Sequence, residues 1–133
     1  MTNHRTEIFI DGSNFFATAK LLGLTIDYKE LRNYLRKTFP GLIRINYYTA
    51  LLQEDDEQIK LKPLVDWMAY NEYNLVTKPA KRHENPDGST FVKGNMDVEI
   101  AVDMLNAATY ATEMVLFSGD GDFISVVEYL QKK

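Results

Sequence analysis

Two aspartates follow an apolar run near the end of this sequence, separated by one glycine. The segment is LFSGDGDF (residues 116–123), and its carboxylates are Asp120 and Asp122. A turn or a helix cap accounts for one of them, because aspartate is favoured in both. Two carboxylates so close repel each other, and a hard divalent cation such as Mg²⁺ or Mn²⁺, which prefers oxygen ligands, would remove that repulsion. The pattern favours a metal site, with helix capping as the simpler alternative for Asp122.

Two further aspartates come from distant parts of the chain. Asp11 ends a short β-rich run, and Asp97 lies in the first turn of a strongly helical segment, 95–108. Asp11 could instead cap the next helix, although Ser13 and Asn14 are better placed, and Asp97 could complement the helix dipole. Together with Asp120 and Asp122, they make four acids from three segments, which we expect to converge at one edge of the fold. A divalent ion among them would hold a phosphodiester and lower the pKa of a water for in-line attack.

Strand-like and helical segments alternate along the sequence. Strands are expected at 7–11, 42–52, 73–82 and 112–117, with a short return strand at 89–93 after the turn NPDG. Helices are expected at 14–23, 27–39, 55–71, 95–108 and 122–133. This alternation predicts an α/β fold of three layers, α/β/α, around a central parallel sheet of about four strands. Ligands of such sheets bind beyond the carboxyl ends of the strands, which is where the four aspartates fall.

The helical segment 95–108 has one evident apolar stripe. Its members are Val98, Ala101, Val102, Leu105 and Ala108. At roughly 100° per residue, Asp97 borders this stripe and Asp103 lies nearly opposite its centre. We therefore expect Asp97 at the site, and Asp103, with Glu99 and Asn106, on a solvated face.

Composition bounds the class of protein. The 133 residues are 45% hydrophobic and 26% charged, as in a globular domain, and the formal charge of −4 argues against coating phosphate by charge alone. Bound divalent cations would change that balance locally. No cysteine and only two histidines are present, which excludes a thiolate zinc site. No run is long and apolar enough for a signal peptide or a membrane span, so a cytoplasmic location without membrane association is expected.

Three motifs, in their order and spacing, resemble the NYN domain of the PIN-like nuclease superfamily, specifically its bacterial LabA-like branch. They are FIDGSN (9–14), KGNMDVEIAVDML (93–105) and LFSGDGDF (116–123). The resemblance covers the whole chain and implies a PIN-like fold with a metal-dependent ribonuclease activity. It implies that the acidic cluster is Asp11, Asp97, Asp120 and Asp122. Asn14 matches the polar position beside the first acid, and Ser118 matches the hydroxyl before the third.

Two features depart from the pattern of this family. Asn95 and Met96 stand where a small apolar residue is usual, which leaves the acid in place. The relatives generally continue past the last helix into a further strand, whereas this sequence ends at Lys133. We expect one NYN domain over residues 1–133, either lacking that strand or having its exposed sheet edge covered by a partner, for example a second copy.

The substrate side of the site is less marked. Basic side chains cluster around the third strand and the loop after it, namely Lys78, Lys81, Arg82, His83 and Lys93. A solvated edge strand explains such a cluster equally well. Lys93, four residues before Asp97, is the one we expect to contact a phosphate backbone. Three tyrosines, Tyr47, Tyr48 and Tyr73, could stack on bases, but core packing is the more common use of tyrosines in strands.

The sequence leads to an endoribonuclease that cuts RNA, expected to be single-stranded, with water activated by one or two Mg²⁺ or Mn²⁺ ions. A non-cleaving RNA-binding or regulatory module of the same fold is the main alternative, favoured by the net acidity. A phosphatase with Asp11 as nucleophile is a third. That reading lacks support, because Ser13 occupies the position two residues later where such enzymes carry a second aspartate.

Overall fold

The computed structural model describes residues 4–52, 66–68, 71–93, 96–118 and 124–131. Within them five strands form one sheet in the order β4-β3-β2-β1-β5. The strands are β1 (Thr6–Asp11), β2 (Leu42–Leu52), β3 (Tyr73–Glu84), β4 (Thr90–Lys93) and β5 (Glu113–Phe117). The pairs β1–β2, β1–β5 and β2–β3 are parallel, whereas β4 pairs with β3 in the antiparallel sense. This confirms a parallel sheet of four strands, extended by the return strand after NPDG.

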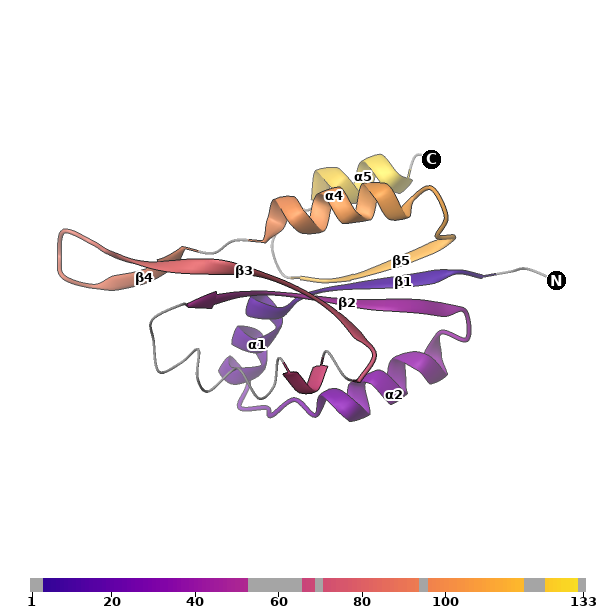
Figure 1. Ribbon diagram of the computed structural model, residues 1–133, viewed down its shortest axis with the longest axis horizontal. Helices are drawn as coiled ribbons and strands as arrows, with labels where there is room; N and C mark the ends of the chain where they lie inside the picture. The colour runs from indigo at the N-terminus through magenta and orange to yellow at the C-terminus, as the bar shows by residue number, and fades with distance from the viewer. Residues whose placement is uncertain (1–3, 53–65, 69–70, 94–95, 119–123, 132–133) are drawn as a thin grey trace.

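Helices cover both faces of this sheet (Figure 1). One face carries α1 (Gly12–Leu21) and α2 (Tyr28–Thr38), and the other carries α4 (Asp97–Ala107) and α5 (Ile124–Gln131). Alternate residues of β1 enter the two cores, because successive side chains of a strand point to opposite faces. Ile8 and Ile10 pack with Leu35 of α2, and Phe9 packs with Ile100 of α4. The three-layer α/β/α fold is thereby confirmed.

The start of α2 and the end of α1 are as the sequence indicates, whereas α1 begins two residues earlier than expected, at Gly12. Asp27 caps α2, since its Oδ1 accepts hydrogen bonds from the N–H groups of Lys29 and Glu30 at 3.0 and 3.1 Å. Gly23 ends α1 with φ = +72°, and the N–H of Leu24 then reaches the carbonyl of Ala19 at 2.8 Å. This is a Schellman ending, for which glycine is the favoured residue.

Strand β3 and its return strand β4 form a hairpin that extends away from the three layers (Figure 1). Its turn is held by Asp87, whose carboxylate accepts from the N–H and the hydroxyl of Ser89 at 2.9 and 2.6 Å. The helix expected at 55–71 falls mostly outside the described residues. Within this range, residues 66–68 are described as helical. In the part of the chain that is described, no helix has the length and apolarity needed to cross a bilayer.

The expected face of α4 is wrong. Val98, Val102 and Leu105 are 72%, 48% and 43% exposed, whereas Ile100 and Met104 are 0% and 3% exposed and pack on the sheet. The helix has two apolar stripes, and the one that is buried continues through Met96 and Ala107. The sequence pattern favoured the longer stripe, but contact with the sheet buries the other.

Candidate active site

Asp11 is the last residue of β1, the strand between β2 and β5. It is only 8% exposed. It is also the N-cap of α1, where Ser13 or Asn14 was expected to cap, and its Oδ1 accepts from the N–H of Asn14 at 3.4 Å. A carboxylate at this place is stabilised by the helix dipole, so capping explains part of its position and leaves room for a second role.

Gly12 lets α1 start directly from the end of β1. A Cβ at this position would lie 2.5 Å from the ring of Tyr47 and 2.6 Å from the backbone oxygen of Tyr48. Tyr47 is buried and its hydroxyl shares a 2.9 Å hydrogen bond with that of Tyr28, so the ring has little freedom to retreat. The glycine of the DGSN motif is therefore a packing requirement, which brings the helix terminus close to β2.

Replacing Gly12 by alanine is expected to reduce the free energy of unfolding by about 1–3 kcal/mol, the usual range for overpacking. The matched control is Gly23→Ala. A Cβ there would meet nothing within 4 Å, so only the positive φ opposes the substitution. That conformation costs roughly 1–2 kcal/mol by itself. Urea unfolding measures both, and a Gly12→Ala protein as stable as the parent would contradict the close packing.

Ser118, the residue after β5, joins Asp11 from the neighbouring strand. Its hydroxyl donates to Asp11 Oδ2 at 3.3 Å. The register explains the contact, because Phe117 lies opposite Ile10 and the next residue of each strand follows in step. The carboxyl ends of β1 and β5 thus meet at one edge of the sheet, as the sequence predicts.

Asp97 is the first residue of α4 and is partly buried. The preceding residue, Met96, is 3% exposed and packs in one cluster with Phe9 and Tyr48. Phe9 lies two residues before Asp11 in β1, and Tyr48 lies opposite Asp11 in β2. The start of α4 and the end of β1 therefore belong to the same end of the domain.

Two acids expected on a solvated face of α4 contact the sheet instead. Asp103 Oδ2 accepts from the hydroxyl of Tyr48 at 2.8 Å, and Glu99 Oε1 accepts from Lys78 Nζ at 3.0 Å. The hydrogen bond from Lys78 lowers the pKa of Glu99 below its usual range. Asn106 alone of the three is exposed, and the reason is the rotation of α4 described above.

The three tyrosines considered for base stacking are core residues. Tyr47, Tyr48 and Tyr73 are 4%, 0% and 4% exposed, so their rings do not reach solvent. Burial is the main cause that raises the pKa of Tyr48, and its bond to Asp103 adds to the rise. Core packing, the more common use of tyrosines in strands, is confirmed for Tyr48, but its place opposite Asp11 follows only from the strand register.

The remaining members of the expected site lie in parts that the structure describes incompletely. Lys93 ends β4 and pairs with Lys81 across the hairpin, and only the backbone of these two residues is described. Asp120 and Asp122 lie outside the described residues. Among those that are described, no three histidines or acids lie together in a way that could hold a metal ion.

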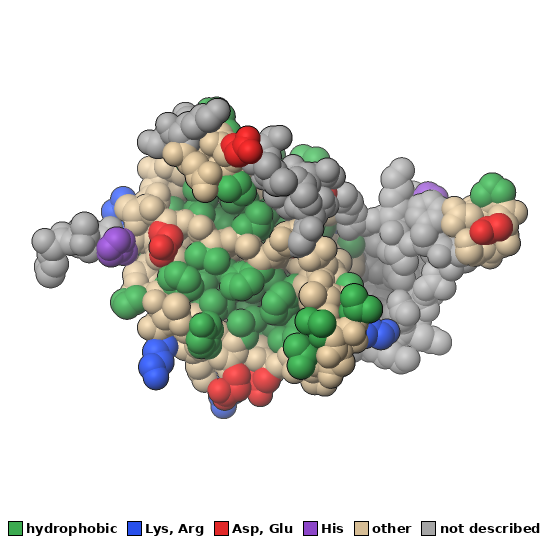
Figure 2. All heavy atoms as spheres, turned by 180° about the vertical axis from the view of Figure 1, so that it is seen from behind, with side chains coloured by type: hydrophobic (Ala, Val, Ile, Leu, Met, Phe, Trp, Pro, Cys, Tyr) green, Lys and Arg blue, Asp and Glu red, His purple; other side chains and the backbone are tan. Residues whose placement is uncertain are grey.

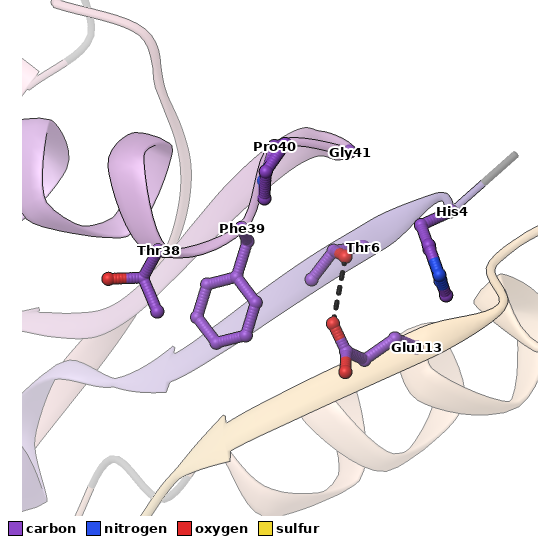
Figure 3. A pocket seen from close by; sticks show the side chains of 7 residues that line it. All are labelled: His4, Thr6, Thr38, Phe39, Pro40, Gly41 and Glu113. Atoms are coloured by element: carbon purple, nitrogen blue, oxygen red, sulfur yellow. Dashed lines mark hydrogen bonds between the residues drawn. The ribbon is translucent and has the colours of Figure 1, made fainter. Parts of the chain in front are cut away.

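A pocket of about 500 Å³ lies at the opposite end of the sheet (Figure 3). His4, Phe39 and Glu113 line it, and the hydroxyl of Thr6 donates to Glu113 Oε1 at 3.0 Å. Because the pocket flanks the amino ends of β1 and β5, it does not include the carboxyl end of β1, where Asp11 lies.

Apolar side chains gather over the middle of the face seen in Figure 2.

Comparison with known proteins identifies the family of this chain and agrees with its fold. The family model of the NYN domain matches residues 5–133. The chain is 34% identical over 132 residues to the low amplitude and bright protein LabA of Synechococcus elongatus, covering 97% of this chain and 69% of LabA. A crystal structure of a protein of unknown function from Vibrio parahaemolyticus has the same fold, with a TM-score of 0.66 and 23% identity over 100% of this chain and 78% of the other. The chain belongs to the NYN domain family, and within it resembles LabA.

Proposed function

We propose that this protein is a metal-dependent endoribonuclease acting on single-stranded RNA in the cytoplasm. Membership of the NYN domain family implies a nuclease-related or RNA-related function. The observation that carries the more specific proposal is Asp11, a nearly buried carboxylate at the carboxyl end of an inner strand, hydrogen-bonded to Ser118 from the next strand. Parallel α/β sheets bind their ligands at this edge.

The donors at this edge fit a hard divalent cation. Asp11 supplies carboxylate oxygens, Ser118 adjoins them with a hydroxyl oxygen, and Asp97 begins α4 at the same end of the domain. Oxygen donors of this kind suit Mg²⁺ or Mn²⁺ and do not suit the softer metals that prefer thiolate. The negative charge of the aspartates would attract a doubly positive ion, and the ion would in turn attract a phosphate group to an otherwise negative site.

In this proposal Asp11, Asp97 and Asp120 hold the ion directly or through water, and Asp122 completes the site or orients a water. When bound, the ion would neutralise the phosphate and favour ionisation of the attacking water. Asn14 and Ser118 orient Asp11 and the substrate through hydrogen bonds. Lys93 attracts the phosphate backbone, four residues ahead of Asp97 in the chain.

Incubation of the purified protein with several labelled single-stranded RNAs tests this function. Cleavage is expected with Mn²⁺ or Mg²⁺, and excess EDTA should abolish it. RNA binding without products, at concentrations of Mn²⁺ that saturate the protein, would replace the proposal by a non-cleaving module. Asp11→Asn serves as the negative control, because it keeps the shape of the side chain and removes its charge.

Self-association through the edge of the sheet is part of the same proposal. In the sheet formed by the described residues β5 is an outer strand, and Met114, Val115, Leu116 and Phe117 are each only partly buried. An apolar edge strand offers unpaired backbone groups to another strand. Light scattering at the concentrations of the assay measures the mass, and a monomer at every concentration would exclude self-association.

A further inference from the structure

Tyr48 links the strand beside Asp11 to the helix that carries Asp97. It lies opposite Asp11 in the parallel ladder of β1 and β2, and its side chain is fully buried against α4. Its hydroxyl donates to Asp103 Oδ2 at 2.8 Å, six residues after Asp97 in the same helix. A hydroxyl so buried costs about 1–3 kcal/mol if it loses its partner. The bond therefore resists any rotation or sliding of α4 that would break it.

A second polar contact acts on the same side of the helix. Lys78 of β3 forms an ion pair with Glu99 at 3.0 Å. At roughly 100° per residue, Glu99 and Asp103 flank one side of the buried stripe, and Asp97 flanks the other. The side held by polar contacts faces β2 and β3, so Asp97 is turned toward β1 and β5, where Asp11 and Ser118 lie.

We propose that Tyr48 and Asp103 form a positioning pair that holds α4 at the rotation and depth at which Asp97 can share an ion with Asp11. This inference rests on the proposed function, because it takes Asp11 and Asp97 as metal ligands. Metal ligands must be held to within about 0.5 Å, and residues behind them commonly provide that precision. Neither Tyr48 nor Asp103 touches the ion in this proposal.

The test compares two substitutions that each remove one tyrosine hydroxyl. Tyr48→Phe removes the bond to Asp103. Tyr110→Phe removes a similar bond, of 2.6 Å to Glu7 Oε1, in which no residue of α4 takes part. Mn²⁺ alone is the probe, and its affinity is measured by titration calorimetry. Tyr48→Phe is expected to weaken binding about tenfold, as for other residues behind metal ligands, and Tyr110→Phe less than about twofold.

The conservative variant Asp103→Asn separates positioning from charge. The amide oxygen of asparagine can still accept from Tyr48, so Mn²⁺ affinity is expected to stay within about threefold of the parent. Affinity in Asp103→Asn as low as in Tyr48→Phe would overturn the proposal, because the charge of Asp103 would then be what matters. Unchanged affinity in Tyr48→Phe would overturn it as well.

A readout without metal keeps this inference apart from the proposed function. Amide hydrogen exchange in the middle of α4, residues 100–104, is expected to be about tenfold faster in Tyr48→Phe than in Tyr110→Phe, since only Tyr48→Phe removes a hydrogen bond made by a residue of α4. If the parent protein binds no Mn²⁺, the proposed function fails, and the exchange rates then decide only whether Tyr48 and Asp103 hold α4 in place. Equal exchange in both variants would refute it.

Discussion

Replacing Asp97 by asparagine is expected to lower metal-dependent RNA cleavage by more than about a hundredfold. Replacing a residue that only supports a metal ligand typically lowers metal affinity or activity by about 10–100-fold, and replacing a ligand itself should cost more. Asparagine keeps the shape of the side chain but loses the charge that would attract the ion in the proposed function. The substitution sits at the first position of α4, where losing a favourable charge on the helix dipole costs only about 0.3–1 kcal/mol. The fold should therefore survive, and single-turnover cleavage with Mn²⁺ is the measurement.

A matched control removes an acid from the first turn of another helix. Glu30 lies in the first turn of α2 and is exposed. Glu30→Gln should change stability as little as Asp97→Asn and leave cleavage unchanged. If the Asp97→Asn protein cuts RNA as fast as the parent while folded by circular dichroism, Asp97 has no part in the chemistry.

Replacing Ile100 by alanine is expected to lower the free energy of unfolding by about 2–5 kcal/mol, the range for truncating a buried aliphatic side chain. Ile100 is 0% exposed and packs with Phe9 and Met104 between α4 and the sheet. Val102→Ala, on the exposed side of the same helix, should change the same quantity by less than about 0.5 kcal/mol. Urea unfolding followed by circular dichroism compares the two.

The two substitutions discriminate between the two apolar stripes of α4. The stripe favoured by the sequence includes Val102, which is 48% exposed, and leaves out Ile100. A larger loss of stability in Val102→Ala than in Ile100→Ala would therefore contradict the packing of α4 described here. That result would also contradict the contact between Asp103 and Tyr48, because the contact requires the side of α4 with Ile100 to face the sheet.

Much of the architecture could be predicted from local rules. The cap Asp27, the glycine that ends α1 and the turn NPDG each act through a few neighbouring residues, so their effects are visible in the sequence. The alternation of strands and helices then leaves few topologies besides a parallel sheet. That sheet in turn places Asp11 and Ser118 at one edge, which the hydrogen bond between them bears out.

The rotation of α4 was beyond such rules. The segment DVEIAVDMLNA carries apolar residues on two sides, so its periodicity does not select one of them. The sheet selects the side, because burying Ile100 and Met104 also brings Asp103 to Tyr48 and Glu99 to Lys78. Tyr48 lies 55 residues from Asp103 in the chain, and Lys78 lies 21 residues from Glu99. No local sequence pattern can anticipate contacts over such separations.

The sequence by itself determined the order of the strands and helices that the structure describes, and the edge of the sheet at which Asp11 and Ser118 meet. Tertiary structure alone decided which side of α4 is buried, that Asp11 caps α1, and that Tyr48 lies beside it in the core. The physical reason is range. Propensities, caps and turns act over a few residues, whereas the choice between two apolar faces depends on hydrogen-bond partners that only the folded chain brings together.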